Sequence, residues 1–133
     1  MIKHAVPLLH VSNSVAAETF YCQVLGFSKE SVQRPSQGQD DPCYMALRRD
    51  GVWLHLSSFS GDGVSGSVVN FYVDDVDVLY EELVGKGAKP EMAPTDQSWG
   101  TREIYVKDAD RNSLRFIEKA VRLVCAENLL MRR

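Results

Sequence analysis

The sequence has few cysteines, no excess of positive charge and no long hydrophobic run. Its 133 residues include three cysteines, Cys22, Cys43 and Cys125, without a Cys-x-x-Cys spacing, so neither a disulfide framework nor a thiolate zinc site is indicated. The net charge of -3 gives no electrostatic case for a nucleic-acid partner and mildly favours cationic ligands. No segment approaches membrane-spanning length or has a signal-peptide pattern. We therefore expect a cytoplasmic protein without a nucleic-acid or membrane partner.

The composition is that of an ordinary globular protein. Hydrophobic residues make up 44% of the chain and charged residues 25%, which excludes disordered and collagen-like classes. A chain of this length buries enough apolar surface for one core without a metal or disulfide staple.

The first half of the chain predicts a strand, a helix and three more strands. The first strand is expected over residues 3–11, at a sheet edge because Pro7 lacks an N–H donor. N-cap residues at 12–14 precede a helix over 15–25, which ends before Gly26. Its apolar face is expected to comprise Ala16, Phe20 and Val24. The three strands are expected at 27–32, 44–48 and 52–58, with a polar loop at 34–42 and a turn at Asp50-Gly51.

The second half repeats this order. A strand over 67–73 precedes Asp75, an N-cap residue, and a helix that ends near Gly85 and Gly87. The apolar face of this helix comprises Val76, Leu79, Tyr80 and Leu83. Short strands are expected at 89–92, 102–106 and 113–117. The last two form a hairpin around the turn at 108–112, where Asn112 tolerates a left-handed conformation.

The two halves are therefore predicted to be copies of one βαβββ module. Asn13 and Asp75, which precede the two helices, are offset by 62 residues, and the glycines that end the helices keep a similar offset. We place the modules at about 1–60 and 66–118 of a single domain, 1–118. Residues 119–133 form a tail that could contain a short helix.

Several segments resemble proteins of the glyoxalase, bleomycin-resistance and extradiol dioxygenase (vicinal oxygen chelate) superfamily. The strongest are Trp-Gly-Thr-Arg-Glu from Trp99 and Asp-Ala-Asp-Arg-Asn-Ser-Leu-Arg-Phe from Asp108. In this turn Ala109 and Arg111 replace the usual Pro and Gly, so we expect strain at Arg111. The resemblance spans residues 5–118. It implies an α+β fold of tandem βαβββ modules that form curved mixed sheets around a cleft, with helices on the outer face, and a homodimer.

The same resemblance locates the positions at which enzymatic members of the superfamily bind a metal ion. Such members place His, Gln or Glu ligands on the first, fourth, fifth and eighth strands. The corresponding positions in this sequence are Val6, His55, Val68 and Arg115. Valine has no lone pair and arginine is a permanent cation, so only His55 could bind a metal. We therefore expect no metal and no cofactor, and no catalytic residue is assigned.

Strand alternation predicts which residues line the cleft. The residues that share a face with the four metal positions are Leu8, His10, Trp53, Ser57, Asn70, Tyr72, Ser113 and Ile117. Trp99 resembles the aromatic residue that antibiotic-binding relatives place over their ligand, and Gly100 would allow close approach of the backbone. The expected ligand-binding residues are therefore Trp99, Gly100, Trp53, His55, Asn70, Tyr72 and Arg115.

Several of these residues also have purely structural interpretations. Trp53 could pack against a helix or a dimer partner, His55 could be a hydrogen-bonded structural histidine, and Arg115 could pair with Glu103 across the hairpin. No Ser or Cys nucleophile pattern is present, and Gly61-x-Gly63-x-x-Gly66 precedes a strand, so it is no dinucleotide-binding loop.

The sequence thus favours non-catalytic binding and sequestration of a small, partly aromatic molecule, as in bleomycin-type antibiotic resistance. Two alternatives stay open at this point. One is a metal-dependent lyase, isomerase or thiol transferase of the same superfamily. The other is an accessory or regulatory dimeric subunit.

Overall fold

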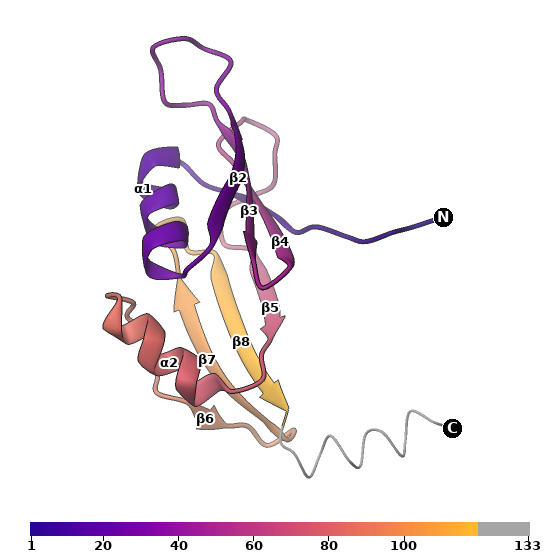
Figure 1. Ribbon diagram of the computed structural model, residues 1–133, viewed down its shortest axis with the longest axis vertical. Helices are drawn as coiled ribbons and strands as arrows, with labels where there is room; N and C mark the ends of the chain where they lie inside the picture. The colour runs from indigo at the N-terminus through magenta and orange to yellow at the C-terminus, as the bar shows by residue number, and fades with distance from the viewer. Residues whose placement is uncertain (120–133) are drawn as a thin grey trace. The chain divides into compact units, whose positions relative to one another are not determined.

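The computed structural model describes residues 1–119, in two compact units. Unit 1 comprises Met1–Val69 and Lys107–Ser113, and unit 2 comprises Asn70–Val106 and the residues from Leu114 onward. Each unit is built around a four-stranded sheet (Figure 1). The predicted tail helix lies outside the described residues, apart from Lys119. No helix in the described part of the chain combines the length and apolar character that a bilayer crossing requires.

The sheet of unit 1 has the strand order β1-β4-β3-β2. β1 (Leu8–His10) runs parallel to β4 (Val52–Ser57), while β3 (Tyr44–Arg49) is antiparallel to both β4 and β2 (Ser28–Gln33). β1 is an edge strand, as predicted, but it is shorter than residues 3–11. Pro7 has no N–H to donate to the sheet. Its carbonyl oxygen accepts a hydrogen bond from the backbone N–H of His55 at 3.0 Å.

The turn between β3 and β4 has the predicted chemistry. Both central residues have positive φ, 51° at Asp50 and 78° at Gly51, the conformation of a two-residue hairpin whose twist matches its strands. The pairing of Arg49 with Val52 on either side fixes the register of the hairpin.

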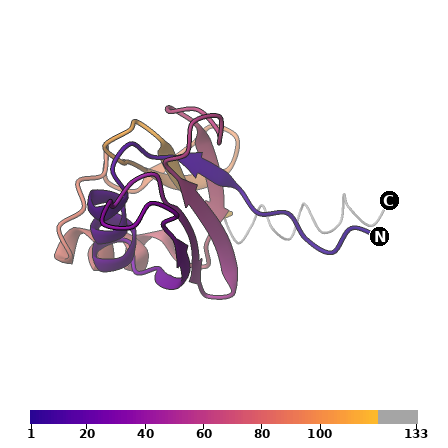
Figure 2. The same cartoon turned by 90° about the horizontal axis from the view of Figure 1, so that it is seen from above.

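The first helix covers one face of this sheet and has a different buried stripe from the predicted one (Figures 1 and 2). It begins as α1 (Ser14–Glu18), capped by the Asn13 side chain, and continues as a π-helix, η1 (Thr19–Val24). The buried residues are Ala17, Tyr21 and Leu25 rather than Ala16, Phe20 and Val24. The Leu25 N–H bonds the Phe20 carbonyl, five residues back. This wider turn keeps Tyr21 and Leu25 on the sheet side.

The sheet of unit 2 has the order β5-β8-β7-β6. Its strands are β5 (Val68–Tyr72), β6 (Thr95–Asp96), β7 (Thr101–Lys107) and β8 (Ser113–Lys119). The expected strand at 89–92 is wrong, and the short strand β6 forms later in the chain. Pro90 and Pro94 lack N–H donors, so only the Glu91 N–H in this segment bonds β7, at the Tyr105 carbonyl.

The helix of unit 2, α2 (Val76–Gly85), begins at the predicted cap. The Asp75 side chain accepts a hydrogen bond from the Val78 N–H. Val76, Leu79 and Leu83 are buried against a sheet face that includes Ile104 and Phe116. Phe116 in turn stacks on Phe71, with 5.4 Å between ring centroids. The apolar stripe was therefore predicted correctly, with Tyr80 at its half-buried edge.

The turn after β7 is held by a network of hydrogen bonds within unit 1. The Asp108 carboxylate accepts hydrogen bonds from the Tyr21 hydroxyl at 2.8 Å, from the backbone N–H groups of Asp110 and Asn112, and from the Asn112 side chain. Burial, and then the charge of Asp108, raise the pKa of Tyr21, so its hydroxyl keeps its proton. In this turn Arg111, at φ 63°, has the left-handed backbone conformation that was predicted for Asn112. Asn112 is buried.

Along the chain the elements follow the predicted βαβββ order twice, in an α+β fold with two four-stranded mixed sheets.

Candidate functional site

Trp99 lies in a tight turn between β6 and β7 in unit 2. The Gly100 N–H bonds the Gln97 carbonyl at 3.0 Å, and the Gln97 N–H bonds the Thr101 carbonyl at 2.7 Å. Gly100 has φ 93°, which few other residues adopt. The turn presents Trp99 to solvent with 62% of its surface exposed. Gly100 therefore has a conformational role, and its proposed role beside a ligand stays a prediction.

The exposed indole is held by a buried carboxylate. The Trp99 Nε1–H donates to Glu103 Oε2 at 3.0 Å, and Thr101 Oγ1 donates to the same oxygen. The Tyr105 hydroxyl donates to Glu103 Oε1 at 2.7 Å. Glu103 itself is only 3% exposed. Three side chains from one turn and one strand face therefore converge on this carboxylate.

These donors keep Glu103 ionised. Burial opposes its charge, but the hydrogen bonds from Thr101, Tyr105 and Trp99 and the positive charge of Arg115 outweigh burial, so the pKa of Glu103 lies below its ordinary value. The hydrogen bond to Glu103 in turn raises the pKa of the Tyr105 hydroxyl. The network thus consists of an anion and neutral donors at physiological pH.

Arg115 lies beside this network on β8. Its guanidinium carbon is 4.8 Å from the centre of the Tyr105 ring, a cation–π contact. Its Nε is buried and has no hydrogen-bond partner in the described part of the chain. A structural interpretation of Arg115 was that it pairs with Glu103 across the hairpin. The structure instead stacks it on Tyr105 and places it near enough to influence Glu103 through its charge.

An open depression lies on the same sheet. It measures about 420 Å³ and is lined by Tyr72, Val73, Asp74, Ile117 and Lys119. Tyr72 is 65% exposed, and the Lys119 Nζ lies 5.4 Å from the centre of its ring. Asn70, two residues before Tyr72 on β5, is also exposed. The alternation of β5 and β8 puts Asn70 on one face with Tyr72, and Arg115 on one face with Ile117. Their role beside a ligand stays a prediction.

Unit 1 carries the remaining predicted ligand residues, Trp53 and His55, on β4. Both are half-buried. The Arg48 guanidinium lies 5.5 Å from the centre of the Trp53 ring. The His55 Nδ1 and the Tyr44 hydroxyl are 2.7 Å apart. Ser57 donates to Asp62 at 2.8 Å rather than to a histidine, so these side chains do not form a Ser-His-Asp relay.

Comparison with known proteins identifies the family. Residues 1–122 match the model of a family described as glyoxalase superfamily protein. The chain belongs to the glyoxalase superfamily. A curated relative, the uncharacterised protein YraH of Bacillus subtilis, is 38% identical over 56 residues, which are 41% of this chain and 44% of YraH. The match therefore spans less than half the length of that relative.

Solved structures of this superfamily share the fold. A bleomycin-binding protein in complex with bleomycin has a TM-score of 0.71 at 22% identity, and the match covers 90% of this chain and 100% of that one. TnmS3, an antibiotic-binding protein from Streptomyces sp. CB03234, has the same TM-score and identity, over 90% and 98% of the two chains. At this identity the likeness shows the fold alone.

The side chains at the superfamily's metal positions do not fit a divalent ion. Val6 and Val68 have no donor atom, and the Arg115 cation is stacked on Tyr105. His55 has a suitable nitrogen, but its Nδ1 is paired with Tyr44. Three of the four positions that the resemblance indicates therefore carry no side-chain metal ligand.

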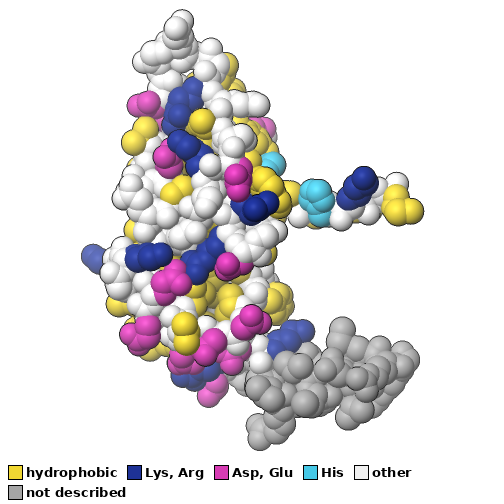
Figure 3. All heavy atoms as spheres, in the orientation of Figure 1, with side chains coloured by type: hydrophobic (Ala, Val, Ile, Leu, Met, Phe, Trp, Pro, Cys, Tyr) yellow, Lys and Arg dark blue, Asp and Glu magenta, His cyan; other side chains and the backbone are white. Residues whose placement is uncertain are grey.

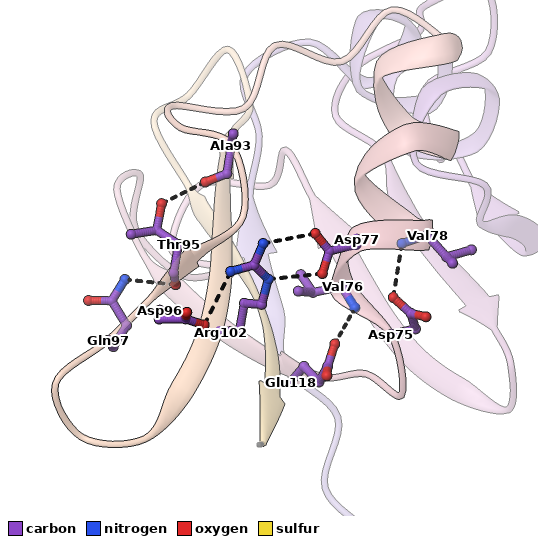
Figure 4. A network of polar contacts seen from close by, with 10 residues as sticks. All are labelled: Asp75, Val76, Asp77, Val78, Ala93, Thr95, Asp96, Gln97, Arg102 and Glu118. Carbon is purple, nitrogen blue, oxygen red and sulfur yellow. Dashed lines mark hydrogen bonds and ion pairs between the residues drawn. The ribbon is translucent and has the colours of Figure 1, made fainter. Parts of the chain in front are cut away.

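One other group of acidic residues comes together in the described chain, on the helix side of unit 2. Ligand atoms of Asp75, Asp77 and Glu118 lie within 4.8 Å of one another. Each carboxylate already has a donor, as Figure 4 shows. Asp75 caps the Val78 N–H, Glu118 accepts from the Val76 N–H, and Asp77 binds Arg102 in a bidentate pair at 2.9 and 3.0 Å. This group fastens α2 to the sheet.

Sequence reasoning missed the centre of the site. Glu103 was not predicted as the centre of the site, and Thr101 and Tyr105 were not predicted as site residues. The available signal was the spacing: an acidic residue flanked at i-2 and i+2 by hydroxyl side chains on one strand face.

Proposed function

We propose that this member of the glyoxalase superfamily binds and sequesters a small, partly aromatic molecule without transforming it. The observation that carries the proposal is the indole of Trp99, which is 62% exposed yet held by its hydrogen bond to Glu103. Ordering a large ring before a ligand arrives lowers the entropic cost of binding. A fixed, exposed aromatic face is suited to stacking on a planar group.

Further aromatic surface supports this proposal. Tyr72 is largely exposed beside the depression that Ile117 and Lys119 also line. Exposed aromatic side chains next to a concave surface are typical of ligand sites. We assign Trp99, Gly100, Asn70, Tyr72 and Arg115 in unit 2 to the ligand.

In unit 1, Trp53 and His55 are proposed as ligand-binding residues of that unit, through their half-buried rings. A homodimer is part of the proposal. The bleomycin-binding protein and the antibiotic-binding protein TnmS3 share the fold, which supports antibiotic binding and resistance as the biological setting. The valines at two metal positions favour capture over metal-dependent catalysis.

Calorimetric titration of the purified protein tests the proposal. The panel comprises bleomycin and planar aromatic compounds that are cationic, neutral or anionic. Trp99→Ala should weaken the binding of a recognised compound by about 1–3 kcal/mol, as expected for a lost aromatic anchor. Trp99→Phe should weaken it less. Val78→Ala, at an exposed position of α2, is the control and should have no effect.

Two results would refute the proposal. One is that no compound in the panel binds. The other is that elemental analysis finds a stoichiometric divalent metal whose removal abolishes a lyase, isomerase or transferase activity.

A further inference from the structure

We propose that the molecule captured by unit 2 is an aromatic anion, such as an aryl carboxylate, and that the Arg115 guanidinium binds its acidic group. The inference rests on the proposed function and names the ligand class. It differs from the expectation drawn from the net charge of the chain, which favours cations. The local arrangement of charge decides between the two.

The carboxylate of Glu103, at the centre of the site, is not available to bind a ligand cation. Both oxygens of Glu103 accept hydrogen bonds from the protein, one from Tyr105 and the other from Trp99 and Thr101. The carboxylate is almost wholly buried, so a ligand cation could not reach it without breaking this network. Glu103 therefore positions the aromatic rings and does not attract a cation.

Arg115, by contrast, has an unused donor. Its Nε lacks an acceptor among the described residues, although it is buried. A buried N–H without a partner costs free energy, which is recovered when the guanidinium turns this edge toward a ligand oxygen. The face of the guanidinium rests on Tyr105, which leaves its edge for the two parallel hydrogen bonds that guanidinium forms with carboxylates.

A second cation lies on the same face of β8. Arg115, Ile117 and Lys119 alternate along the strand and share one face. Ile117 and Lys119 reach the depression beside Tyr72. Among the described residues, Asp74, which is exposed, is the one acidic side chain that lines it. The surface thus combines an aromatic ring and an aliphatic side chain with positive charge.

Among the described residues of unit 2, a group of acidic side chains lies on the helix side. Figure 3 shows acidic side chains gathered over the part of unit 2 that carries α2. Among them, Asp75 caps the helix and Asp77 is paired with Arg102. On β8, Glu118 accepts a hydrogen bond from the Val76 N–H of α2. Arg115, Ile117 and Lys119 alternate with Glu118 along the strand, so they belong to the opposite face of the sheet. Charge complementarity at that face therefore favours an anion.

Three probes of one shape test the inference on the full chain. They are 2-naphthoate, 2-naphthylmethanol and 2-naphthylmethylammonium, each titrated by calorimetry at neutral pH and low salt. The anion should bind at least about tenfold more tightly than the cation, with the neutral alcohol between them. Arg115→Gln should weaken naphthoate binding about tenfold and leave the alcohol within about twofold.

Two further variants make the result specific. Arg115→Lys keeps the charge but loses the paired donors, so it should give an intermediate affinity for naphthoate. Lys86→Gln removes one positive charge from the residue that follows α2, outside the site, and should leave the order of the probes unchanged. Circular dichroism of each variant reports whether it is folded.

The outcomes separate the two proposals. If the alcohol binds but the anion has no advantage, or if Arg115→Gln keeps that advantage, the inference about charge is wrong and capture of aromatic molecules stands. Tighter binding of the cation than of the anion would also overturn the inference about charge and leave capture standing. If none of the three probes and no other aromatic compound binds, the proposed function fails as well.

Discussion

The indole N–H of Trp99 donates to the Glu103 carboxylate at 3.0 Å, so a largely exposed ring is fixed by a buried anion. Thr101 and Tyr105 complete the coordination of that anion. An exposed tryptophan without such a bond would sample several rotamers and lose their entropy on binding. In this protein the network orders the Trp99 ring during folding, so its rotamer entropy is lost before a ligand binds.

Replacing Glu103 should loosen this network. In Glu103→Gln the amide group brings a donor to a position where three donors already converge, so one contact becomes repulsive. We expect the free energy of unfolding to fall by about 1–3 kcal/mol, measured by urea denaturation. Glu30→Gln, at a half-exposed position on β2, should change it by less than about 0.5 kcal/mol. If the two substitutions changed the free energy of unfolding equally, the Glu103 hydrogen bonds would not be the cause.

The same carboxylate should make stability depend on pH. The folded pKa of Glu103 lies below its ordinary value of 4.5, so the unfolded chain takes up its proton first as pH falls. Its stabilisation is therefore complete above the unfolded pKa and is lost as pH drops through the folded one. The stability difference between wild type and Glu103→Gln, from urea curves at a series of pH values, should shrink below about pH 4.5. A difference that grew with acidity would show the opposite shift.

The Asp108 turn should be a major source of stability in unit 1. Tyr21→Phe removes the hydroxyl that donates to Asp108 at 2.8 Å and should cost about 1–2 kcal/mol of unfolding free energy. Asp108→Ala leaves all its donors unpaired and should cost about 3 kcal/mol or more. Tyr80→Phe, at a half-buried position on α2, is the matched control. If it cost as much as Tyr21→Phe, the hydrogen bond would not be the cause.

Arg111 should be a site of local strain. Its φ of 63° is in the left-handed region, which is unfavourable for a residue with a Cβ. Arg111→Gly is therefore expected to raise the free energy of unfolding by about 0.5–1 kcal/mol, measured by thermal or urea denaturation. Ala109→Gly, in the same turn without positive φ, should lower it. Stabilisation by both glycines would point to a general effect of the turn and not to strain at Arg111.

Elements set by local chemistry could be predicted from the sequence. The Asp75 cap, the Asp50-Gly51 turn and the stripe of α2 each follow from side chains within a few residues of one another. In the first helix the buried residues are Ala17, Tyr21 and Leu25, and the wider turn at Thr19–Val24 keeps Leu25 on the same side as Tyr21. The Tyr21 hydroxyl donates to Asp108, which is far away along the chain. A pattern of neighbouring residues cannot predict such a contact.

The site could be predicted only in part, for a similar reason. Trp99 stood out by its resemblance to antibiotic-binding relatives, and Arg115 by its departure from the metal-ligand pattern. The sequence did not predict the burial of Glu103, because a carboxylate is seldom buried. Its burial depends on a turn that returns Trp99 to the strand. The left-handed residue at 111 rather than 112 was likewise decided by Asn112, whose side chain binds Asp108 and the His10 carbonyl.

Metal-independent capture by Trp99 is tested most directly by tryptophan fluorescence. The chain has two tryptophans, so Trp53→Phe leaves Trp99 as the only reporter. Titration of this variant with the tightest compound from the calorimetric panel should change the Trp99 emission saturably, with the same affinity in the presence and absence of a chelator. Binding that leaves the emission unchanged, or that disappears when metal is chelated, would contradict the account.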